Sequence, residues 1–367
     1  MRRYFIIAAV LLGAIACTKN EVAPFEAETP ISFQVASFLS QTKAAANAEY
    51  AGTTFGCYAW YDSEALDGEN QEFMVNETIE KAVIQAATET TPAVNEWKPA
   101  GKTYFWPKTG DIDFFAYAPK MDTPWVVCDD SNHKLSASKT TIKGDEDFLY
   151  SSMSMNYEKN VDPALQKEYS HVNAGVPILF HHALAQLTVN FAAAETEKSG
   201  NTWVITVNKA EFVNVANAGT LAMEMEDEAD GLVEWTLPEN SIWAASEDDA
   251  DFAPLVAAQN LSLTKTLAPQ KLSGRTVLPQ SLAGMKFHIN FTIKTSHDGG
   301  RTFYSVEDID RNYDVATIFS TAGAYWKMNT KITYNVTISP NSTSEVLFDP
   351  AVVDWAPEVS ADYTINN

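Results

Sequence analysis

Cys17 is the residue whose type and setting most clearly suggest covalent chemistry. It follows residues 13–16, which are mostly small and end an apolar run over residues 4–16. Arg2 and Arg3 precede that run, which is shorter than the roughly 20 apolar residues needed to span a bilayer. A thiol in this position can form a thioether to diacylglycerol, and small neighbours let a signal peptidase approach the backbone.

This segment resembles the lipobox of bacterial lipoproteins, with Ala14 in the place where leucine is usual. The resemblance implies a signal peptide over residues 1–16, lipidation of Cys17, and attachment to outer-membrane lipid through the acylated cysteine. Residues 17–28 would then form a polar tether. The alternative is an ordinary secretory signal that happens to end at a cysteine.

Residues of other reactive types form no pattern typical of catalysis or metal binding. The sequence lacks the spaced histidines, cysteines and glycines of the common zinc, phosphate and hydrolase motifs. His181 and His182 are adjacent, and neighbours on a strand point to opposite faces, so they are poorly placed to share a metal. The acidic run 224–228 lacks the ligand spacing of an EF-hand loop. We therefore predict no catalytic residue, no metal ligand and no cofactor.

Six aromatic side chains could instead stack on sugar rings. Each lies in a strand-like stretch, where packing into the core is the usual use of an aromatic ring. Both interpretations stay open for these residues, which are Trp60, Tyr61, Tyr104, Trp106, Phe114 and Phe115.

The charge balance restricts the partners of the chain. It has 48 acidic and 25 basic residues and a net charge of −23. Removal of the signal peptide, which contains Arg2 and Arg3, would make the net charge −25. Such a surface repels the phosphates of nucleic acids, so we expect no nucleic-acid partner. Besides Cys17 there are Cys57 and Cys128, which could form a disulfide in an oxidising compartment or remain buried free thiols.

The side-chain pattern predicts strands along most of the chain. Many short strands between turns favour β-sandwiches, and the length suggests about two domains. Asp298, Gly299 and Gly300 predict a hairpin turn, and Ile79, Val83 and Ala86 predict one short amphipathic helix. The clearest alternation of apolar and polar residues covers 31–35, 187–191, 203–207, 287–293 and 332–338.

Several segments occur in an order typical of one known family. They are residues 55–60, 104–107, 113–119, 147–150, 180–185, 278–280, 348–350 and 353–355. Together with the lipobox they resemble the fimbrillin family of Bacteroidetes, the lipoprotein pilins of type V fimbriae. The resemblance implies an all-β fold with two transthyretin-like β-sandwich domains in tandem, over residues 29–187 and 188–367.

The resemblance also implies a mode of assembly. In such pilins a trypsin-like protease cuts after a basic residue in the loop that follows the first strand, which here begins near Ile31. The freed strand leaves, and a strand of another subunit fills the apolar groove. Lys43 is the only basic residue between Lys19 and Lys81, so processing is expected at its bond to Ala44. The family often has arginine here, and the alternative is an ordinary surface lysine.

A donor strand is suggested at the C-terminus, over residues 356–367. Apolar residues alternate with polar ones there, at Val359, Ala361, Tyr363 and Ile365. The alternative makes this segment the last strand of the C-terminal sandwich.

The resemblance therefore implies a structural or accessory subunit of cell-surface fimbriae that supports adhesion and is not an enzyme. Its partners would be other fimbrial subunits, outer-membrane lipid, and a host or bacterial surface ligand of unknown identity. The alternative is a surface glycan-binding lipoprotein of a polysaccharide-uptake system. A buried, separable first strand favours the fimbrial interpretation, and exposed coplanar aromatic rings favour the alternative.

Overall fold

The computed structural model describes residues 29–37, 48–62, 71–85, 94–107, 110–121, 126–129, 134–151, 154–157, 175–194, 202–224, 233–238, 261–264, 270–271, 274–318, 324–340 and 346–354. Within these ranges the protein is built almost entirely from β-strands, which confirms the expected all-β fold. Their one helix is α2 (Val315–Ile318), and none of the described helical structure is long and apolar enough to cross a membrane.

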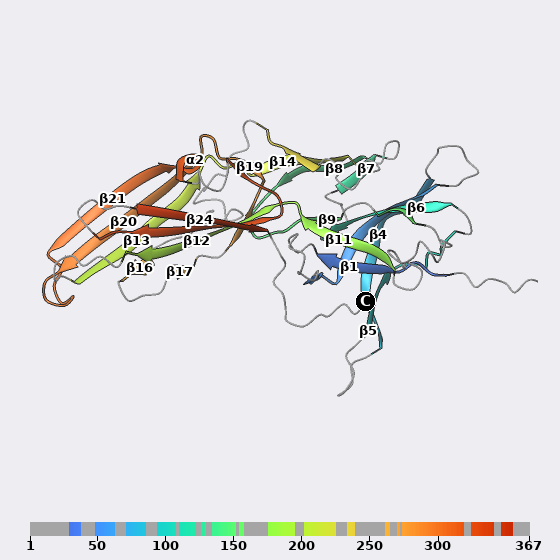
Figure 1. Cartoon of the computed structure of the whole chain (residues 1–367), viewed down its shortest axis with the longest axis horizontal. Coiled ribbons are helices and arrows are strands. Elements are labelled where there is room, and N and C mark those ends of the chain that lie inside the picture. The colour runs from blue at the N-terminus through green and yellow to red at the C-terminus, as the bar shows by residue number, and fades with distance from the viewer. Residues whose placement is uncertain are drawn as a thin grey trace, which may run out of the picture.

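Nine strands form one sheet that closes on itself (right in Figure 1). Its order is β10-β6-β3-β4-β5-β1-β11-β9, with β2 beside β1, and β9 pairs with β6 as well as with β11. The strands are β1 (Phe33–Ser37), β2 (Ala48–Glu49), β3 (Thr54–Asp62), β4 (Gln71–Gln85), β5 (Val94–Pro99), β6 (Asp111–Ala118), β9 (Leu149–Ser151), β10 (Ser154–Tyr157) and β11 (Val176–His182). In this arrangement β1 is an inner strand and not an edge.

Two further sheets pack face to face at the other end of the molecule (left in Figure 1). One has the order β17-β12-β23-β24 with β18 beside β12, and the other has the order β16-β13-β20-β21. Their strands are β12 (Ala185–Ala193), β13 (Thr202–Val213), β16 (Leu261–Leu263), β17 (Gln270–Lys271), β18 (Arg275–Val277), β20 (Lys286–Ser296), β21 (Ser305–Asp314), β23 (Thr330–Ile338) and β24 (Val346–Asp354). The rings of Phe212 and Tyr334 meet across the two sheets at 5.2 Å, and those of Phe287 and Phe348 at 5.6 Å, so the pair is a β-sandwich.

A fourth sheet takes strands from both parts of the chain and so connects them. Its strands, in order, are β15 (Val233–Thr236), β14 (Ala218–Glu224), β8 (Lys134–Thr141) and β7 (Val126–Asp129). The short strands β19 (Gln280–Ser281) and β22 (Tyr325–Trp326) form a separate pair. The amide of Ala183 also donates to the carbonyl oxygen of Phe148 at 2.8 Å. Residues 187 and 188 both lie in β12, and a domain boundary between them stays a prediction.

Strand β3 contributes to two hydrophobic cores. Its side chains Phe55, Cys57 and Ala59 face the interior of the nine-stranded sheet. Tyr58 and Trp60, at the alternate positions of the same strand, face the core that is shared with the rest of the molecule. Successive side chains of a strand point to opposite faces, so a strand that is buried on both sides needs a nearly continuous apolar run. This explains why this stretch of β3 has no charged residue.

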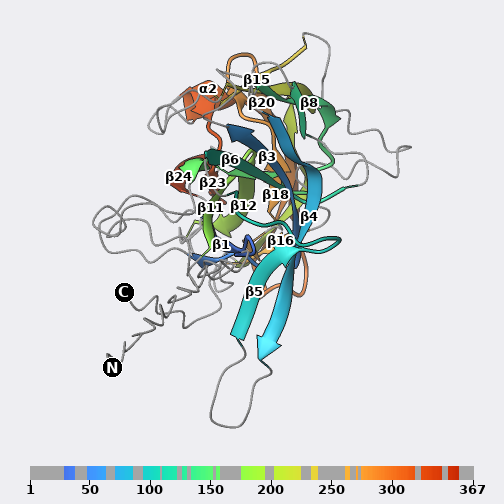
Figure 2. The same ribbon diagram turned by 90° about the vertical axis from the view of Figure 1, so that its right-hand side faces the viewer.

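The short helix predicted from Ile79, Val83 and Ala86 is wrong, because Ile79 and Val83 lie in strand β4 and Ala86 lies outside the described residues. A spacing of four residues fits one face of a helix and also one face of a strand, since four is a multiple of two. Strand β4 extends with β5 as an arm beyond the body of the molecule (Figure 2), and Val83 on this arm is 62% exposed although Ile79 is fully buried.

The hairpin predicted from Asp298, Gly299 and Gly300 is confirmed. Strand β20 ends at Ser296 and pairs along its length with β21, which begins at Ser305. Gly299 and Gly300 have φ angles of 74° and 90°, which side chains disfavour and glycine adopts freely.

Candidate functional site

The best-formed site is the place that β1 fills between β5 and β11. We call it the first-strand slot and define it by the facing edges of these two strands and the buried rings of Phe55, Trp97, Phe114 and Phe180. Strand β1 runs parallel to β11 over its whole length, from the pair Phe33 with Val176 onward. Among the described residues, its pairing with β5 is limited to Phe33 and Trp97. On that same side Ala36 and Ser37 pair with β2, so β1 is paired continuously along β11 and in two separate places along its other edge.

Apolar side chains of the first strand enter the core beneath the slot. Ile31, just before β1, is 2% exposed, and Phe33 is 4% exposed. The ring of Phe33 lies nearly perpendicular to the rings of Phe55 and Phe114, at centroid distances of 5.9 and 5.7 Å. Full burial of one such side chain contributes about 1.5–3 kcal/mol, so these two residues anchor the segment. The prediction of a strand that begins near Ile31 and faces the interior is confirmed.

Backbone hydrogen bonds also hold the segment that precedes β1. The amide of Val176 donates to the carbonyl oxygen of Ser32 at 2.8 Å, and the amide of Ile31 donates to that of Tyr104 at 2.8 Å. The amide of Trp106 donates to the carbonyl oxygen of Thr29 at 3.0 Å. These bonds come from the backbone, so a different strand with the same alternation could accept and donate them.

Gly175 sets how closely the first strand approaches β11. Its φ angle is 86°, and a Cβ atom at this position would lie 2.8 Å from the carbonyl carbon of Phe33. Both the conformation and the space therefore require glycine here. Residues this close to the backbone of β1 decide which strands the slot can accept.

Two polar side chains border the interior of the nine-stranded sheet. The hydroxyl of Tyr50 donates to the carbonyl oxygen of Thr54 at 3.1 Å, and burial, with a smaller effect of the Asp147 charge, raises the pKa of Tyr50 to about 12. Cys57 is a buried free thiol, and burial and the nearby Glu77 carboxylate raise its pKa. Cys57 is thus unreactive and forms no disulfide, whereas the side chain of Cys128 lies outside the described residues.

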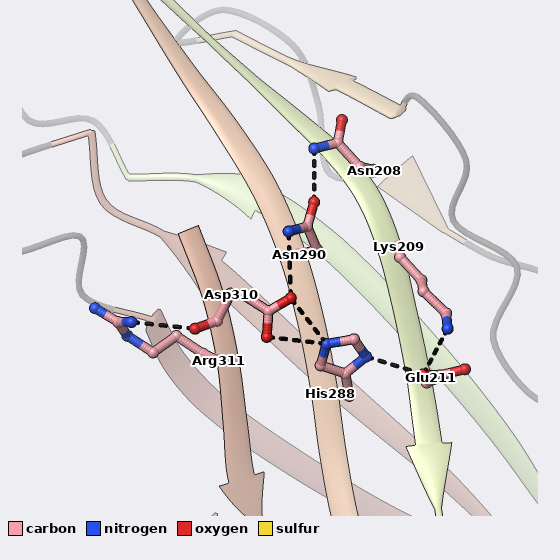
Figure 3. A network of polar contacts seen from close by, with 7 residues as sticks. All are labelled: Asn208, Lys209, Glu211, His288, Asn290, Asp310 and Arg311. Carbon is pink, nitrogen blue, oxygen red and sulfur yellow. Dashed lines mark hydrogen bonds and ion pairs between the residues drawn. The ribbon is translucent and has the colours of Figure 1, made fainter. Parts of the chain in front are cut away.

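A second polar arrangement lies on the outer face of the sandwich, across β13, β20 and β21 (Figure 3). At its centre, Nδ1 of His288 lies 2.9 Å from Oε1 of Glu211, and Nε2 lies 3.1 Å from Oδ1 of Asp310. Nζ of Lys209 lies 2.8 Å from the same Glu211 oxygen, and Nδ2 of Asn290 donates to Oδ2 of Asp310 at 3.3 Å. We call these five residues the outer network. It fixes three strands in register.

Hydrogen bonds within the outer network change the acidity of its carboxyl groups. Partial burial favours the neutral form of Glu211, but the hydrogen bonds from Lys209 and His288 outweigh it and lower the pKa of Glu211. The hydrogen bond from His288 lowers the pKa of Asp310. The network lies on an open sheet face, and no three His, Cys, Asp or Glu residues of the described chain are grouped to hold a metal ion.

We expect E211Q to lower the free energy of unfolding by about 1 kcal/mol at pH 7, because it removes charge-assisted hydrogen bonds. The folded pKa of Glu211 lies below its unfolded value of about 4.3, so its contribution is complete above that pH and is lost as the pH falls further. Urea unfolding at several pH values should therefore show the two proteins converging below about pH 4. The exposed Glu234, replaced by glutamine, is the control, and a difference that grows in acid would contradict the assignment.

The other sequence candidates are placed as follows. His182 is buried with Nδ1 2.8 Å from Oδ2 of Asp147, and His181 stacks on Tyr150, so the adjacent histidines do point to opposite faces. Of the six aromatic residues considered for sugar stacking, Tyr61 is half-buried and the other five are at most 7% exposed, which confirms the core interpretation for those five.

The residues predicted for processing and assembly lie outside the described part of the chain. They are Cys17, Lys43, Ala44, Val359, Ala361, Tyr363 and Ile365. Sequence reasoning in turn missed Gly175 and the outer network. An isolated glycine before a strand could have signalled a close approach, but nothing in the sequence relates His288 to Glu211, which is 77 positions away.

The sequence matches the model of the fimbrillin-like family over residues 42–355, and no curated protein matches it. Among solved structures, it is similar to a candidate cell adhesion protein from Bacteroides uniformis, with 18% identity, a TM-score of 0.45, and coverage of 89% of this chain and 98% of that one. A second such protein, from Parabacteroides distasonis, shows 11% identity, a TM-score of 0.48 and coverage of 91% and 99%. The fimbrial anchor protein Mfa2 of Porphyromonas gingivalis shows 12% identity, a TM-score of 0.31 and coverage of 89% and 98%.

Proposed function

This chain belongs to the fimbrillin-like family, and we propose that it is a structural or accessory subunit of cell-surface fimbriae that supports adhesion. It is exported as a lipoprotein and held at the outer membrane through acylated Cys17. It joins other subunits by strand exchange in the first-strand slot. The subunit consists of two domains, over residues 29–187 and 188–367.

The burial of the first strand supports this proposal best. Ile31 and Phe33 fill an apolar site inside a sheet, yet they belong to a short segment at the beginning of the described chain. Removing it would expose unpaired backbone groups of β11 and apolar side chains below. A strand from another subunit would cover both at once, as in donor-strand complementation.

The position of the expected cleavage site is consistent with release of that strand. Strand β1 ends at Ser37 and pairs with β2, which begins at Ala48. The bond between Lys43 and Ala44 thus belongs to the connection between two neighbouring strands. Cleavage there separates β1 from the rest of the protein without cutting any described strand.

The C-terminal residues supply a donor with the required alternation. After β24 the chain continues through Val359, Ala361, Tyr363 and Ile365, separated by polar residues. The first strand has the same period, with Ile31 and Phe33 inward and Gln34 outward. Buried apolar side chains at alternate positions are what the first-strand slot accommodates.

Mild trypsin treatment of the purified precursor tests the proposal. We expect a single early cut after Lys43, followed by dimers and larger oligomers that resist dissociation at room temperature. The gain on filling the slot is on the order of 5–10 kcal/mol for three or four buried side chains, which suits a durable joint. N-terminal sequencing identifies the cut, and gel filtration follows the oligomers.

The variant K43A is the matched control, because it removes the cleavage site and leaves β1 unchanged. It should stay uncut and monomeric under the same treatment. If the wild-type protein is cut after Lys43 and remains monomeric, strand exchange is not its mode of assembly. If trypsin cuts elsewhere first, Lys43 is not the processing site.

A glycan-binding lipoprotein was the alternative interpretation. It shares the lipid anchor and the all-β fold and needs surface aromatic rings as well, but five of the six aromatic residues considered form part of the core. The fimbrial proposal is supported instead by the buried first strand and by the match to the fimbrillin-like family.

A further inference from the structure

The turn between β20 and β21, residues 296–304, is a preformed surface at one end of the molecule. Oγ of Ser296 donates to Oδ1 of Asp298 at 2.6 Å and accepts from the amide of Gly300 at 2.9 Å. Oδ1 of Asp298 also accepts from the amide of Thr302 at 2.8 Å. The amide of Tyr304 donates to the carbonyl oxygen of Thr295 at 3.0 Å. These bonds give the turn one conformation, so a ligand would not have to order it.

An exposed pair of stacked rings lies on this turn. The rings of His297 and Tyr304 are parallel within 2°, with their centroids 3.7 Å apart. Tyr304 is still 51% exposed, so its other ring face is open to solvent. Phe303, beside it, is 37% exposed, and Arg301 is exposed as well. Large apolar side chains at the tip of a rigid hairpin have no role in the core.

The rest of the β20–β21 hairpin holds this turn in a fixed position. The β20–β21 hairpin reaches the left-hand end of the molecule in Figure 1, away from the first-strand slot. The outer network clamps its two strands together, since His288 and Asn290 on β20 both bind Asp310 on β21 (Figure 3). Oγ1 of Thr292 donates to Oδ1 of Asp308 at 2.6 Å, which continues the clamp toward the turn. The tip is thus carried on a stiff, projecting support.

We propose that this turn is a carbohydrate-binding site, with the open face of Tyr304 as the platform and Arg301 as a hydrogen-bond donor. The C–H groups on one face of a sugar ring carry partial positive charge and meet the negative face of an aromatic ring, while its hydroxyls accept from a guanidinium. The site goes beyond the strand exchange proposed above and is independent of it.

The charges identify the class of sugar. The chain as a whole has a net charge of −23, which repels polyanionic ligands such as sulfated or heavily sialylated glycans. The turn itself carries one positive group, Arg301, and one carboxylate, Asp298, so it favours neither cationic nor anionic ligands at close range. A neutral ligand with one apolar face and several hydroxyls satisfies both conditions, and a neutral hexose-based oligosaccharide has these properties.

A printed array of neutral oligosaccharides, with sialylated and sulfated forms of the same sugars beside them, tests the inference on the purified protein. We expect binding to at least one neutral oligosaccharide, with a Kd of about 1 mM or tighter when it is titrated in solution. Y304A should weaken this binding about tenfold or more, whereas Y304F should keep it because the ring face remains. R301A should weaken it less than Y304A.

Tyr325 provides the matched control, since it is 57% exposed but lies on β22, outside the turn. Y325A should bind the oligosaccharide as the wild type does, and circular dichroism should show that all variants are folded. The inference is overturned if no neutral oligosaccharide binds, if the charged forms bind better, or if Y304A binds equally well. It is also overturned if Y304A changes only the oligomers formed after trypsin treatment, because the turn is then a contact between subunits. Failure of this experiment leaves the cleavage result after Lys43 unaffected.

Discussion

Replacing Phe33 with alanine is expected to destabilise the nine-stranded sheet by about 3–5 kcal/mol, the usual cost of removing a fully buried phenylalanine. Phe33 is 4% exposed and packs edge-on against Phe55 and Phe114, whose rings cannot move into the space because both are themselves fully buried. A cavity therefore remains. Guanidinium unfolding should show an earlier transition, and amide hydrogen exchange should locate the loss in β1 and β11.

The neighbouring residue gives the control for this experiment. Gln34 belongs to the same strand but points to solvent, so Q34A should change the free energy of unfolding by less than about 0.5 kcal/mol. F33L keeps most of the apolar volume and should lie between the two. Equal effects of F33A and Q34A would mean that Phe33 does not anchor the first strand.

The same substitution bears on assembly. If β1 is held mainly through Ile31 and Phe33, weakening that anchor should speed its release once the chain is cut. Trypsin-treated F33A should therefore form oligomers faster than the treated wild type. A slower rate would indicate that the first strand does not limit exchange.

Replacing Gly175 with alanine is expected to lower the free energy of unfolding by more than the backbone strain at this position accounts for. At φ 86°, any side chain costs on the order of 1–2 kcal/mol. The new Cβ would in addition lie 2.8–3.0 Å from three backbone atoms of Phe33, which cannot move without breaking the pairing of β1 with β11. We expect a total loss of about 3 kcal/mol or more.

Gly284 separates these two contributions. Its φ angle is 76°, close to that of Gly175, but a Cβ there would meet no atom within 4 Å. G284A should therefore show the cost of the backbone conformation only, about 1 kcal/mol. Hydrogen exchange at the amides of β1 should rise in G175A and stay unchanged in G284A. If both variants lose the same stability, the close approach to Phe33 has no energetic weight.

Together, these experiments ask whether one short strand is both essential and replaceable. Essential means that its two anchors stabilise the sheet, and replaceable means that its backbone bonds suit any strand of the same period. The family match begins at residue 42 and so does not include β1. The anchoring roles of Ile31 and Phe33 therefore come from the structure of this chain and not from the family match.

Local features of the sequence were sufficient to predict the class of fold. Alternation of apolar and polar residues identified β12, β13, β20 and β23, because the period of two comes from the strand itself and needs no partner. The turn at Gly299 and Gly300 was predictable for the same reason, since a positive φ depends on the residue in that place. The order of segments indicated the family. The lipidation, cleavage and donor sites stay predictions from sequence.

The tertiary structure alone decided which strands are neighbours. Period two is the same for every strand, so it cannot say that β1 lies between β5 and β11 or that β9 closes the sheet. It also could not distinguish β4 from a helix at a spacing of four. The approach of Gly175 to Phe33, the contacts of His288 with two other strands, and the stacking of His297 on Tyr304 all join residues that only folding brings together. Contacts of this kind depend on the whole chain, because each strand is placed by the partners that bury its apolar face.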